Sequence, residues 1–381
     1  MDNTAIIGIG MTKIEANKKG DTFADMAWEA VNNALTDAGM TIDEVDNVVT
    51  TSNDFWDGRT ISCMAVGDAS GASNKNVSCV EGDGTFGAFY GLTRILSGSY
   101  GTTLVTAHSK GSESVSSLIT NAAFDPIYER ALGMDMITAS AMQARRYMHV
   151  TGTLPEHLAM VSVKNHGNGI RNPLAQLPMK ITVDDVLASE MIADPLHKLD
   201  CSPVSDGCCA IILANESRAR QYSGKPVWIK GVSFCSDAFF MGDRELAFSR
   251  SLRAAAQKAY GMAAVGDPSK EIHVAELYDA FTYQELMWIE GLGLCRPGEA
   301  KGLLEKGAFD LEGVLPVNPS GGLLSGHPVI AGGLIRMAEA VRQLRGEADE
   351  YQVDGATKAV AQGVNGLCGQ SHCVWVLGKK K

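Results

Sequence analysis

Clusters of basic residues and long apolar runs are both missing from this sequence of 381 residues. The formal net charge is -11, and the longest basic run is the terminal KKK. This argues against a nucleic-acid-binding protein, which needs Lys and Arg gathered on one face. No apolar run reaches the ~18 residues of a membrane-spanning helix, and residues 1–11 lack the charged start and apolar core of a signal peptide. We therefore expect a cytoplasmic protein.

Cysteines at metal-binding spacing are also absent. The nine cysteines include no CxxC pair, and the one adjacent pair is Cys208-Cys209. In a chain of this kind most thiols are small buried hydrophobic groups. We therefore expect no metal site within the chain.

A repeated order of strand-like and helix-like segments is present instead, in a composition of 45% hydrophobic and 20% charged residues typical of a globular protein. TAIIGIGMTKI, the helical pattern TFADMAWEAVNNALTDAGM and VDNVVTTS form the first set. VWIKGVSF, the helical pattern ELAFSRSLRAAAQKAYGM and HVAELYDAF form the second. The helix FGAFYGLTRILSG is likewise matched by AGGLIRMAEAVRQLRG, and the strands TTLVTAH and HCVWVLG follow them.

These sets predict two similar β-α-β-α-β halves, each with a mostly parallel sheet, related by a pseudo-twofold axis. We assign residues 1–111 and 206–222 to the N-terminal half and residues 223–381 to the C-terminal half. Residues 112–205 are an insert with two helical patterns, ASAMQARRYMHVTG and LPEHLAMVSVKNHGNG, and a loop, RNPLAQLPMKI. We expect this insert to form a lid or substrate-covering region.

Several motifs along these halves resemble those of the thiolase superfamily: VAELYDAF at 274–281, NPSGGLLSGHP at 318–328 and the C-terminal VNGLCGQSHCVWVL. The insert and the DCSPVSDG turn resemble thiolases of the sterol-carrier-protein type. The resemblance implies a five-layered αβαβα fold, dimers, and coenzyme A thioesters as substrates with no bound cofactor. It also implies a heterotetramer with a small zinc-ribbon/OB-fold protein, which would supply the metal that this chain lacks.

The resemblance places His327, in SGHP, on the catalytic histidine of the family, where a neutral imidazole activates a thiol or donates to an enolate oxygen. The family carries an Asn or His for its oxyanion hole where this chain reads Tyr278-Asp279, and we take both residues as catalytic candidates. Ala280 stands where the sterol-carrier type usually has a cysteine. One acid/base candidate of the family is therefore missing.

The C-terminal glycine loop places Cys368 near the second cysteine of other thiolases, although anchoring on Gly369-Gln370 puts Asn365 or Gly366 at that column. The coenzyme A contacts are expected from the SGG turn, Gly84 and Gly369, together with the insert around Asn165 to Asn172. The three residues of the turn are Ser320, Gly321 and Gly322.

The nucleophile position leaves two registers open in NVSCVEGDGTFG. Cys79 gives a thiol at a helix mouth, where the helix dipole lowers its pKa. The Val80-Glu81 pair instead puts Gly84 at the nucleophile column, with no thiol. Glu81 and Asp83 would then lie at the same helix mouth, and capping of the helix is favoured over a role as base.

The leading hypothesis is an acyl-CoA C-acyltransferase that cleaves or forms a β-keto acyl-CoA, such as a bulky aryl- or branched-succinyl thioester. A retro-aldolase that acts on a β-hydroxy acyl-CoA needs no nucleophilic cysteine and is the alternative. A non-catalytic subunit that binds acyl-CoA is the third hypothesis.

Overall fold

A computed structural model of the protein describes residues 4–58, 61–222 and 224–381. Nine strands within these residues form one mixed sheet in the order β3-β2-β4-β7-β1-β8-β11-β10-β9. The strands are β1 (Thr4–Met11), β2 (Asn47–Ser52), β3 (Asn76–Glu81), β4 (Thr102–Lys110), β7 (Asp206–Asn215), β8 (Val227–Ser236), β9 (Val274–Glu276), β10 (Lys358–Asn365) and β11 (Ser371–Gly378).

The two predicted halves meet where β1 pairs with β8 over only two residue pairs, Ala5 with Trp228 and Ile6 with Val227. On either side of this joint the strands follow one pattern, β2-β4-β7-β1 in the first half and β9-β10-β11-β8 in the second. The counterpart of TTLVTAH is therefore β10, and our pairing of it with HCVWVLG was wrong. That segment is β11, the counterpart of β7, and the insert between β4 and β7 hid the correspondence.

The expectation of mostly parallel sheets was also wrong. Parallel pairing joins β2 to β3 and β4, and β9 to β10, whereas β1, β7, β8 and β11 run antiparallel to their neighbours. Strands buried on both faces read as continuous apolar runs, which carry no information on strand direction. The connections between the strands decided whether neighbouring strands run parallel or antiparallel.

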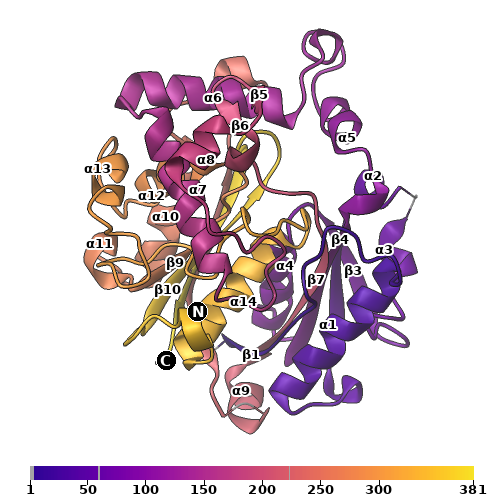
Figure 1. Ribbon diagram of the computed structural model, residues 1–381. Helices are drawn as coiled ribbons and strands as arrows, with labels where there is room; N and C mark the ends of the chain where they lie inside the picture. Colours follow the sequence, from indigo (N-terminus) through magenta and orange to yellow (C-terminus); the bar gives the residue numbers. More distant parts are fainter. Residues whose placement is uncertain (1–3, 59–60, 223) are drawn as a thin grey trace.

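Five helices complete the αβαβα layers of the fold (Figure 1). α4 and α14 pack between the two halves of the sheet, α1 covers the outer face of the first half, and α10 and α12 cover the second. Their bounds are α1 (Phe23–Ala38), α4 (Gly84–Leu96), α10 (Arg250–Met262), α12 (Thr282–Gly291) and α14 (Gly332–Arg345). The expected five-layered fold is confirmed.

Local sequence signals determine where these helices begin and end. A capping box of Thr22 and Asp25 begins α1, and Gly39, at φ 67°, ends it. Gly346, at φ 77°, ends α14 in the same way. Left-handed backbone costs little for glycine, so these ends were readable from the sequence.

The insert of residues 112–205 supplies one wall of the molecule above the sheet (Figure 1). Both of its predicted helices are confirmed, and RNPLAQLPMKI holds no helix or strand. Its elements are α5 (Ser116–Ala122), α6 (Met136–Thr151), α7 (Pro155–Gly169), α8 (Val183–Ala188), β5 (Met191–Ala193) and β6 (Leu196–His197). Shorter helices elsewhere are α2 (Asp54–Asp57), α3 (Ser62–Ala65), α9 (Glu216–Tyr222), α11 (Pro268–Glu271) and α13 (Ala300–Leu304).

The domain boundaries drawn from the sequence stay predictions. Residues 1–3, 59–60 and 223, which belong to the predicted halves, lie outside the described residues. In the described part of the chain, no helix has both the length and the apolar character needed to cross a bilayer.

Candidate active site

A cavity of ≈ 520 Å³ opens where loops of both halves meet the insert. Its walls come from the end of β3, from α5 and the start of α6, from the turn at 201–204 and from the segment after β9. The loop before α14 and the loop between β10 and β11 close it. The polar or ionisable side chains of its lining are those of Asn53, Glu81, Asp83, Ser116, Thr120, Cys201, Ser202, Tyr278, Gln284, His327, Asn365, Cys368 and Gln370. The remaining described lining residues are apolar or glycine, and none is Lys or Arg.

Tyr278 and His327 meet in this lining. The Tyr278 hydroxyl lies 2.8 Å from His327 Nε2 and 3.0 Å from the carbonyl oxygen of Val329. The Ser202 hydroxyl lies 2.8 Å from the other ring nitrogen, Nδ1. Burial lowers the pKa of His327 to about 3, with a smaller contribution from the Arg336 charge. The imidazole is therefore neutral at physiological pH.

The hydrogen bonds select one tautomer of this histidine. The Val329 carbonyl can only accept, so the single Tyr278 hydroxyl proton goes to it, and Nε2–H of His327 donates to the tyrosine oxygen. Nδ1 then accepts from Ser202. Burial also holds the pKa of Tyr278 well above its ordinary value, with a smaller contribution from Asp83. Both side chains are therefore neutral, and in this structure their protons are shared with the Val329 carbonyl and the tyrosine oxygen.

The turn DCSPVSDG holds the histidine in place. Ser205 Oγ accepts the His327 backbone N–H at 2.8 Å, and Val204 pairs with His327 as a parallel bridge. The Ser202 N–H donates to the Ala280 carbonyl, which ties the turn to the Tyr278 segment. Sequence reasoning singled out this turn but not Ser202, although a serine beside a recognised motif was the available signal.

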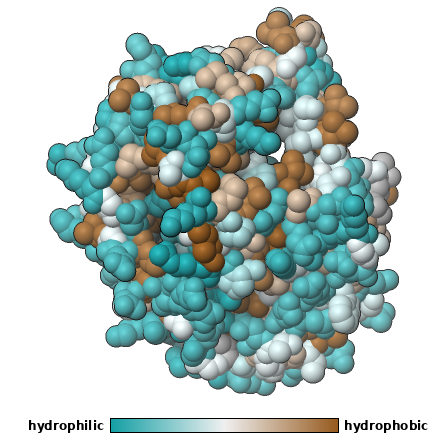
Figure 2. Space-filling model, in the orientation of Figure 1, coloured by the Kyte–Doolittle hydropathy of each residue, from teal (hydrophilic) through white to brown (hydrophobic). Residues whose placement is uncertain are grey.

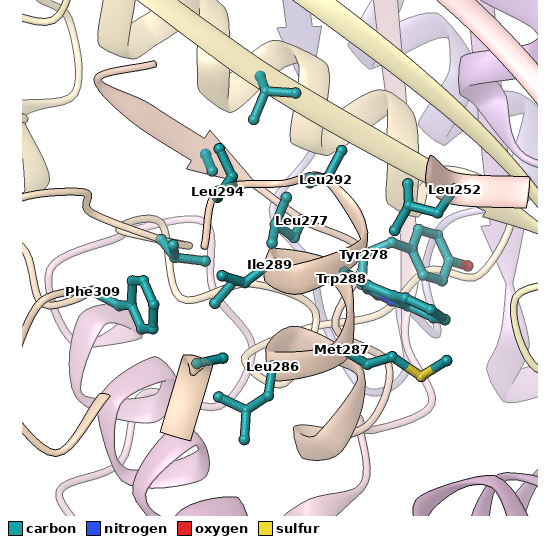
Figure 3. Close-up of a cluster of buried hydrophobic side chains, with 14 of the residues drawn as sticks. Leu252, Leu277, Tyr278, Leu286, Met287, Trp288, Ile289, Leu292, Leu294 and Phe309 are labelled. Carbon is teal, nitrogen blue, oxygen red and sulfur yellow. The ribbon is translucent and has the colours of Figure 1, made fainter. Parts of the chain in front are cut away.

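Tyr278 is fixed through its backbone and its ring. Its N–H donates to Gln362 Oε1 at 3.0 Å, and Trp288 Nε1 donates to its carbonyl at 2.9 Å. Figure 3 shows the ring at the edge of the cluster formed by α12, with the hydroxyl pointing away from the buried leucines. The Tyr278 ring therefore packs in the core while its hydroxyl takes part in the polar contacts with His327.

The residue at the start of α4, beside the cavity, is Gly84 and not Cys79. α4 begins at Gly84, where an added Cβ would lie 2.7 Å from Leu334 Cβ and 2.9 Å from Ala107 Cβ. Cys79 lies within the exposed edge strand β3, 3.4 Å from Ser52 Oγ, and does not line the cavity. The expectation that Cys79 sits at a helix mouth is wrong, because the strand continues to Glu81.

Asp83 joins the beginnings of two helices. Its side chain accepts the Thr85 N–H at the start of α4, at 2.9 Å, and the Gly333 N–H at the start of α14, at 2.7 Å. An added Cβ at Gly333 or Gly363 would collide with the carboxylate. Burial raises the pKa of Asp83 to about 6, against the opposing hydrogen bonds. Capping was the favoured interpretation, and the link to α14 was not foreseen.

Cys368 and Gly369 lie in the lining, within the loop between β10 and β11. Their φ values are 49° and 67°. Ser140 Oγ approaches the Cys368 sulfur at 3.7 Å, and burial raises the pKa of this thiol to about 11. An added Cβ at Gly369 would lie 2.6 Å from Trp288 Cη2, so glycine is required there.

Asp279 and the SGG turn lie behind the cavity wall, in contrast to their predicted catalytic and coenzyme A-binding roles. Asp279 accepts from the Leu323 N–H at 2.6 Å and from Asn165 Nδ2 at 2.7 Å. Ser320 Oγ donates to Glu276 at 2.7 Å. Ser320, Gly321, Gly322 and Asp279 do not line the cavity. They shape the loop that carries His327.

The segment from Asn165 to Asn172, where coenzyme A contacts were predicted, holds buried asparagines. Asn168 and Asn172 are buried, and their amide groups donate to the carbonyl oxygens of Asn318 and Ser320, both at 3.0 Å. These bonds hold the NPSGG turn against α7. Asparagines in this pattern are equally consistent with a ligand-binding loop and with buried amides that hold a turn in place. The sequence could not distinguish these two roles.

No group of three or more His, Cys, Asp or Glu side chains suited to a metal ion occurs among the described residues.

Known proteins resemble the chain in sequence and in structure. The family described as "Thiolase C-terminal domain-like" matches residues 235–379. The chain is 35% identical to the acetyl-CoA acetyltransferase of Methanothermobacter thermautotrophicus, over 97% of this chain and 98% of that protein. It is 32% identical to benzoylsuccinyl-CoA thiolase subunit BbsB of Thauera aromatica, over 62% of each, and 30% identical to human sterol carrier protein 2, over 93% of this chain and 68% of that protein.

A solved structure named "Ltp2-ChsH2(DUF35) aldolase" superposes with a TM-score of 0.87 at 28% identity, covering 100% of this chain and 98% of that one.

Proposed function

Since the chain belongs to the thiolase superfamily, we propose that it is an acyl-CoA C-acyltransferase, an enzyme that cleaves or forms a β-keto acyl-CoA between its α- and β-carbons. The proposal is carried by one observation. The neutral Tyr278–His327 pair lies in the lining of a mostly apolar cavity. The acyltransferase names of its relatives support the same reaction class.

The Tyr278–His327 pair supplies the hydrogen-bond donors that an enolate oxygen requires. When the bond to the α-carbon breaks, negative charge develops on the thioester oxygen. The Tyr278 hydroxyl can turn its proton from the Val329 carbonyl to that oxygen while it still accepts from His327 Nε2–H, so neither group needs to change protonation. In a cavity with little water such donors act more strongly than in solution.

The acyl acceptor is proposed to be the thiol of free coenzyme A. Gly84 brings no side chain to the mouth of α4, and Asp83 already satisfies the Thr85 and Gly333 N–H groups there. Coenzyme A reacts as its thiolate after its thiol proton has passed to solvent. Its sulfur bonds to the β-carbon, the bond between the α- and β-carbons breaks, and Cys368 gives its thiol proton to the α-carbon. The Cys368 thiolate then takes a proton from solvent. The products are two acyl-CoA thioesters.

The acyl group is proposed to be bulky and apolar. Ile119, Met136, Ile137, Phe239 and Phe281 line the cavity, which is far larger than an acetyl group. A relative is named for benzoylsuccinyl-CoA, which supports an aryl group. The carboxylate of a succinyl group would find Glu81 and Asp83 in the lining and, among the described lining residues, neither Lys nor Arg.

A homodimer and a small zinc-ribbon/OB-fold partner complete the proposal. The solved structure named with a DUF35 protein supports such a partner. Apolar side chains gather at the outer end of the insert, at the upper right of Figure 2: Leu118, Ile127, Tyr128 and Leu132, each more than 60% exposed. Exposed groups of this kind are typical of protein contact surfaces.

A retro-aldolase is the second candidate, favoured by Gly84. Without a thiol at the helix mouth, a β-hydroxy acyl-CoA would give its β-hydroxyl proton to a carboxylate of the lining, Glu81 or Asp83, break the bond to the α-carbon and leave a carbonyl product. The α-carbon would then take a proton from Tyr278 or Cys368. The structural relative named as an aldolase supports this reaction class.

The test is purification together with any protein that co-elutes, followed by a screen of aryl and branched acyl-CoA thioesters with and without free coenzyme A. Cleavage that requires free coenzyme A supports the acyltransferase, and cleavage without it supports the aldolase. Binding without turnover in every combination of partners would overturn both and support a non-catalytic subunit.

A further inference from the structure

His372 is a fully buried histidine of β11 that the proposed reaction does not use. Its Nδ1 lies 2.8 Å from Gln362 Nε2, on the neighbouring strand β10. Its ring meets the Trp288 indole edge to face, with 4.6 Å between the ring centroids. Burial lowers the pKa of His372 to about 3, so the imidazole is neutral at physiological pH.

The orientation of the Gln362 amide determines which ring nitrogen carries the proton. The Tyr278 N–H can only donate, so Gln362 Oε1 accepts it at 3.0 Å and Nε2 faces His372. Nδ1 is then the acceptor, and the ring proton is on Nε2. That Nε2–H is buried and has no hydrogen-bond partner among the described residues, which costs free energy. A phenylalanine would pack against Trp288 without this cost, so the acceptor at Nδ1 is what the histidine adds.

Tyr278 depends on other side chains for the position of its backbone. It lies in the irregular segment between β9 and α12, where the regular hydrogen bonds of a strand or helix are not available. Gln362 Oε1 accepts its N–H, and Trp288 Nε1 donates to its carbonyl at 2.9 Å. Both of these side chains contact His372, and Figure 3 shows the Trp288 indole beside Tyr278. One ring therefore supports both polar groups of the Tyr278 backbone.

Gly369 connects the same ring to the cavity. It lines the cavity, and an added Cβ there would lie 2.9 Å from His372 Nε2 and 2.6 Å from Trp288 Cη2. The imidazole therefore lies directly behind the wall that carries Cys368. The Tyr278 segment and this wall rest on one buried support.

We propose that His372 is a positioning residue for Tyr278: it holds the Gln362 amide in the orientation that accepts the Tyr278 N–H, and so keeps the Tyr278 hydroxyl where it meets the enolate oxygen. The inference rests on the proposed function for the reaction that this hydroxyl serves. Without Nδ1, the Gln362 amide loses the contact that selects its orientation, and a turned amide would present its NH₂ group to the Tyr278 N–H. Misplacing a reacting group by ~1 Å costs about 10²-fold in rate, so a small shift of this backbone is enough to slow the reaction.

The first test measures hydrogen exchange of single backbone amides in the full-length protein, and it needs no substrate. In H372F the Tyr278 N–H should exchange about 3-fold to 10-fold faster, the size expected for loss of one hydrogen bond. The Leu277 N–H is the matched control, because it donates to Asn318 Oδ1 at 2.7 Å and its rate should not change. Equal Tyr278 rates in H372F and wild type, or an equal acceleration at Leu277, would overturn the proposal. If H372F does not fold, H372M removes the same acceptor with a flexible side chain and is judged by the same two amides.

The second test measures turnover in a double-mutant cycle with Y278F. H372F should lower kcat about 10-fold in the wild-type background, with little change in KM, and less than about 2-fold in Y278F, where the hydroxyl is already gone. H372N, whose side-chain oxygen can replace Nδ1 as the acceptor, should keep kcat closer to that of the wild type than H372F does, although it leaves more empty space. Equal losses in both backgrounds would contradict the proposal. Faster Tyr278 exchange in a protein that cleaves no thioester would reject the proposed function and leave this inference standing.

Discussion

Tyr278 and His327 show how two ordinary side chains acquire a shared chemistry. They lie 49 residues apart, so no local sequence pattern joins them. Burial keeps the histidine neutral and the tyrosine protonated, and the carbonyl of Val329 decides which atom carries the proton. Both residues are therefore set up to donate hydrogen bonds at neutral pH.

Removing the tyrosine hydroxyl tests this pair. Y278F should lower kcat by about 10²-fold to 10³-fold, the size expected for loss of one preorganised donor to an oxyanion. The ring remains, so the melting temperature should change little. S202A, which removes the donor to Nδ1 but leaves Tyr278 intact, is the matched control and should have a smaller effect. Equal kcat in Y278F and wild type would exclude the hydroxyl from the reaction.

The neutral histidine also predicts how stability depends on pH. The pKa of His327 is about 3 in the folded protein, below its ordinary unfolded value of about 6.5, so the unfolded chain binds the extra proton first. Stability should therefore fall as the pH decreases from about 6.5 toward 4, by at most about 1.4 kcal/mol per pH unit from this group. Urea unfolding from pH 8 to 4 should show a shallower loss in H327Q, and parallel curves would contradict the assignment.

At the scale of elements, the start of α4 decides the type of chemistry available. A thiol at that point would be activated by the helix dipole. The chain instead has Gly84 enclosed by Leu334 and Ala107, with Asp83 capping both α4 and α14. The helix mouth therefore joins the two halves of the molecule and holds no nucleophile.

Two glycine-to-alanine substitutions test whether Gly84 is tightly enclosed. G84A should destabilise the protein by about 1–3 kcal/mol, because its Cβ would overlap Leu334 and Ala107. G167A, in α7, meets nothing within 4 Å and should stabilise it by about 0.5–1 kcal/mol through helix propensity. Both are measured by urea unfolding. A neutral G84A would mean that the α4 mouth can accept a side chain.

At the scale of the whole molecule, β3 is the end strand of the nine-stranded sheet, with no further strand beside it among the described residues. β3 pairs with β2 on one side only, and its side chains are largely exposed. An exposed strand edge readily pairs with another chain. This edge supports the predicted homodimer.

V77K tests the edge. Val77 is 43% exposed on β3, and a lysine there places like charges together in a paired edge. Light scattering should find a dimer for the wild type and a larger monomer fraction for V77K. Lys75→Glu, just before the strand, is the control for a change of surface charge. A wild-type monomer, or a dimer unaffected by V77K, would place the contact elsewhere.

The sequence by itself determined the features that depend on neighbouring residues. Thr22 with Asp25, Gly39 and Gly346 determined the helix ends, and the repeated order of segments determined the two halves. The SGHP turn carried part of the resemblance that placed His327 on the catalytic histidine of the family.

Tertiary structure decided which side chains meet. Asp83 reaches Gly333 across 250 residues, and Ser202 reaches His327 across 125. It also decided that Asp279 and Ser320 brace the histidine loop, that Cys79 lies on an outer strand and that Gly84 begins α4. Helix caps and turns can be predicted from short sequence patterns, because their contacts join residues only a few positions apart. The side chains that line the cavity depend on how the two halves of the fold and the insert pack together, which no single segment encodes.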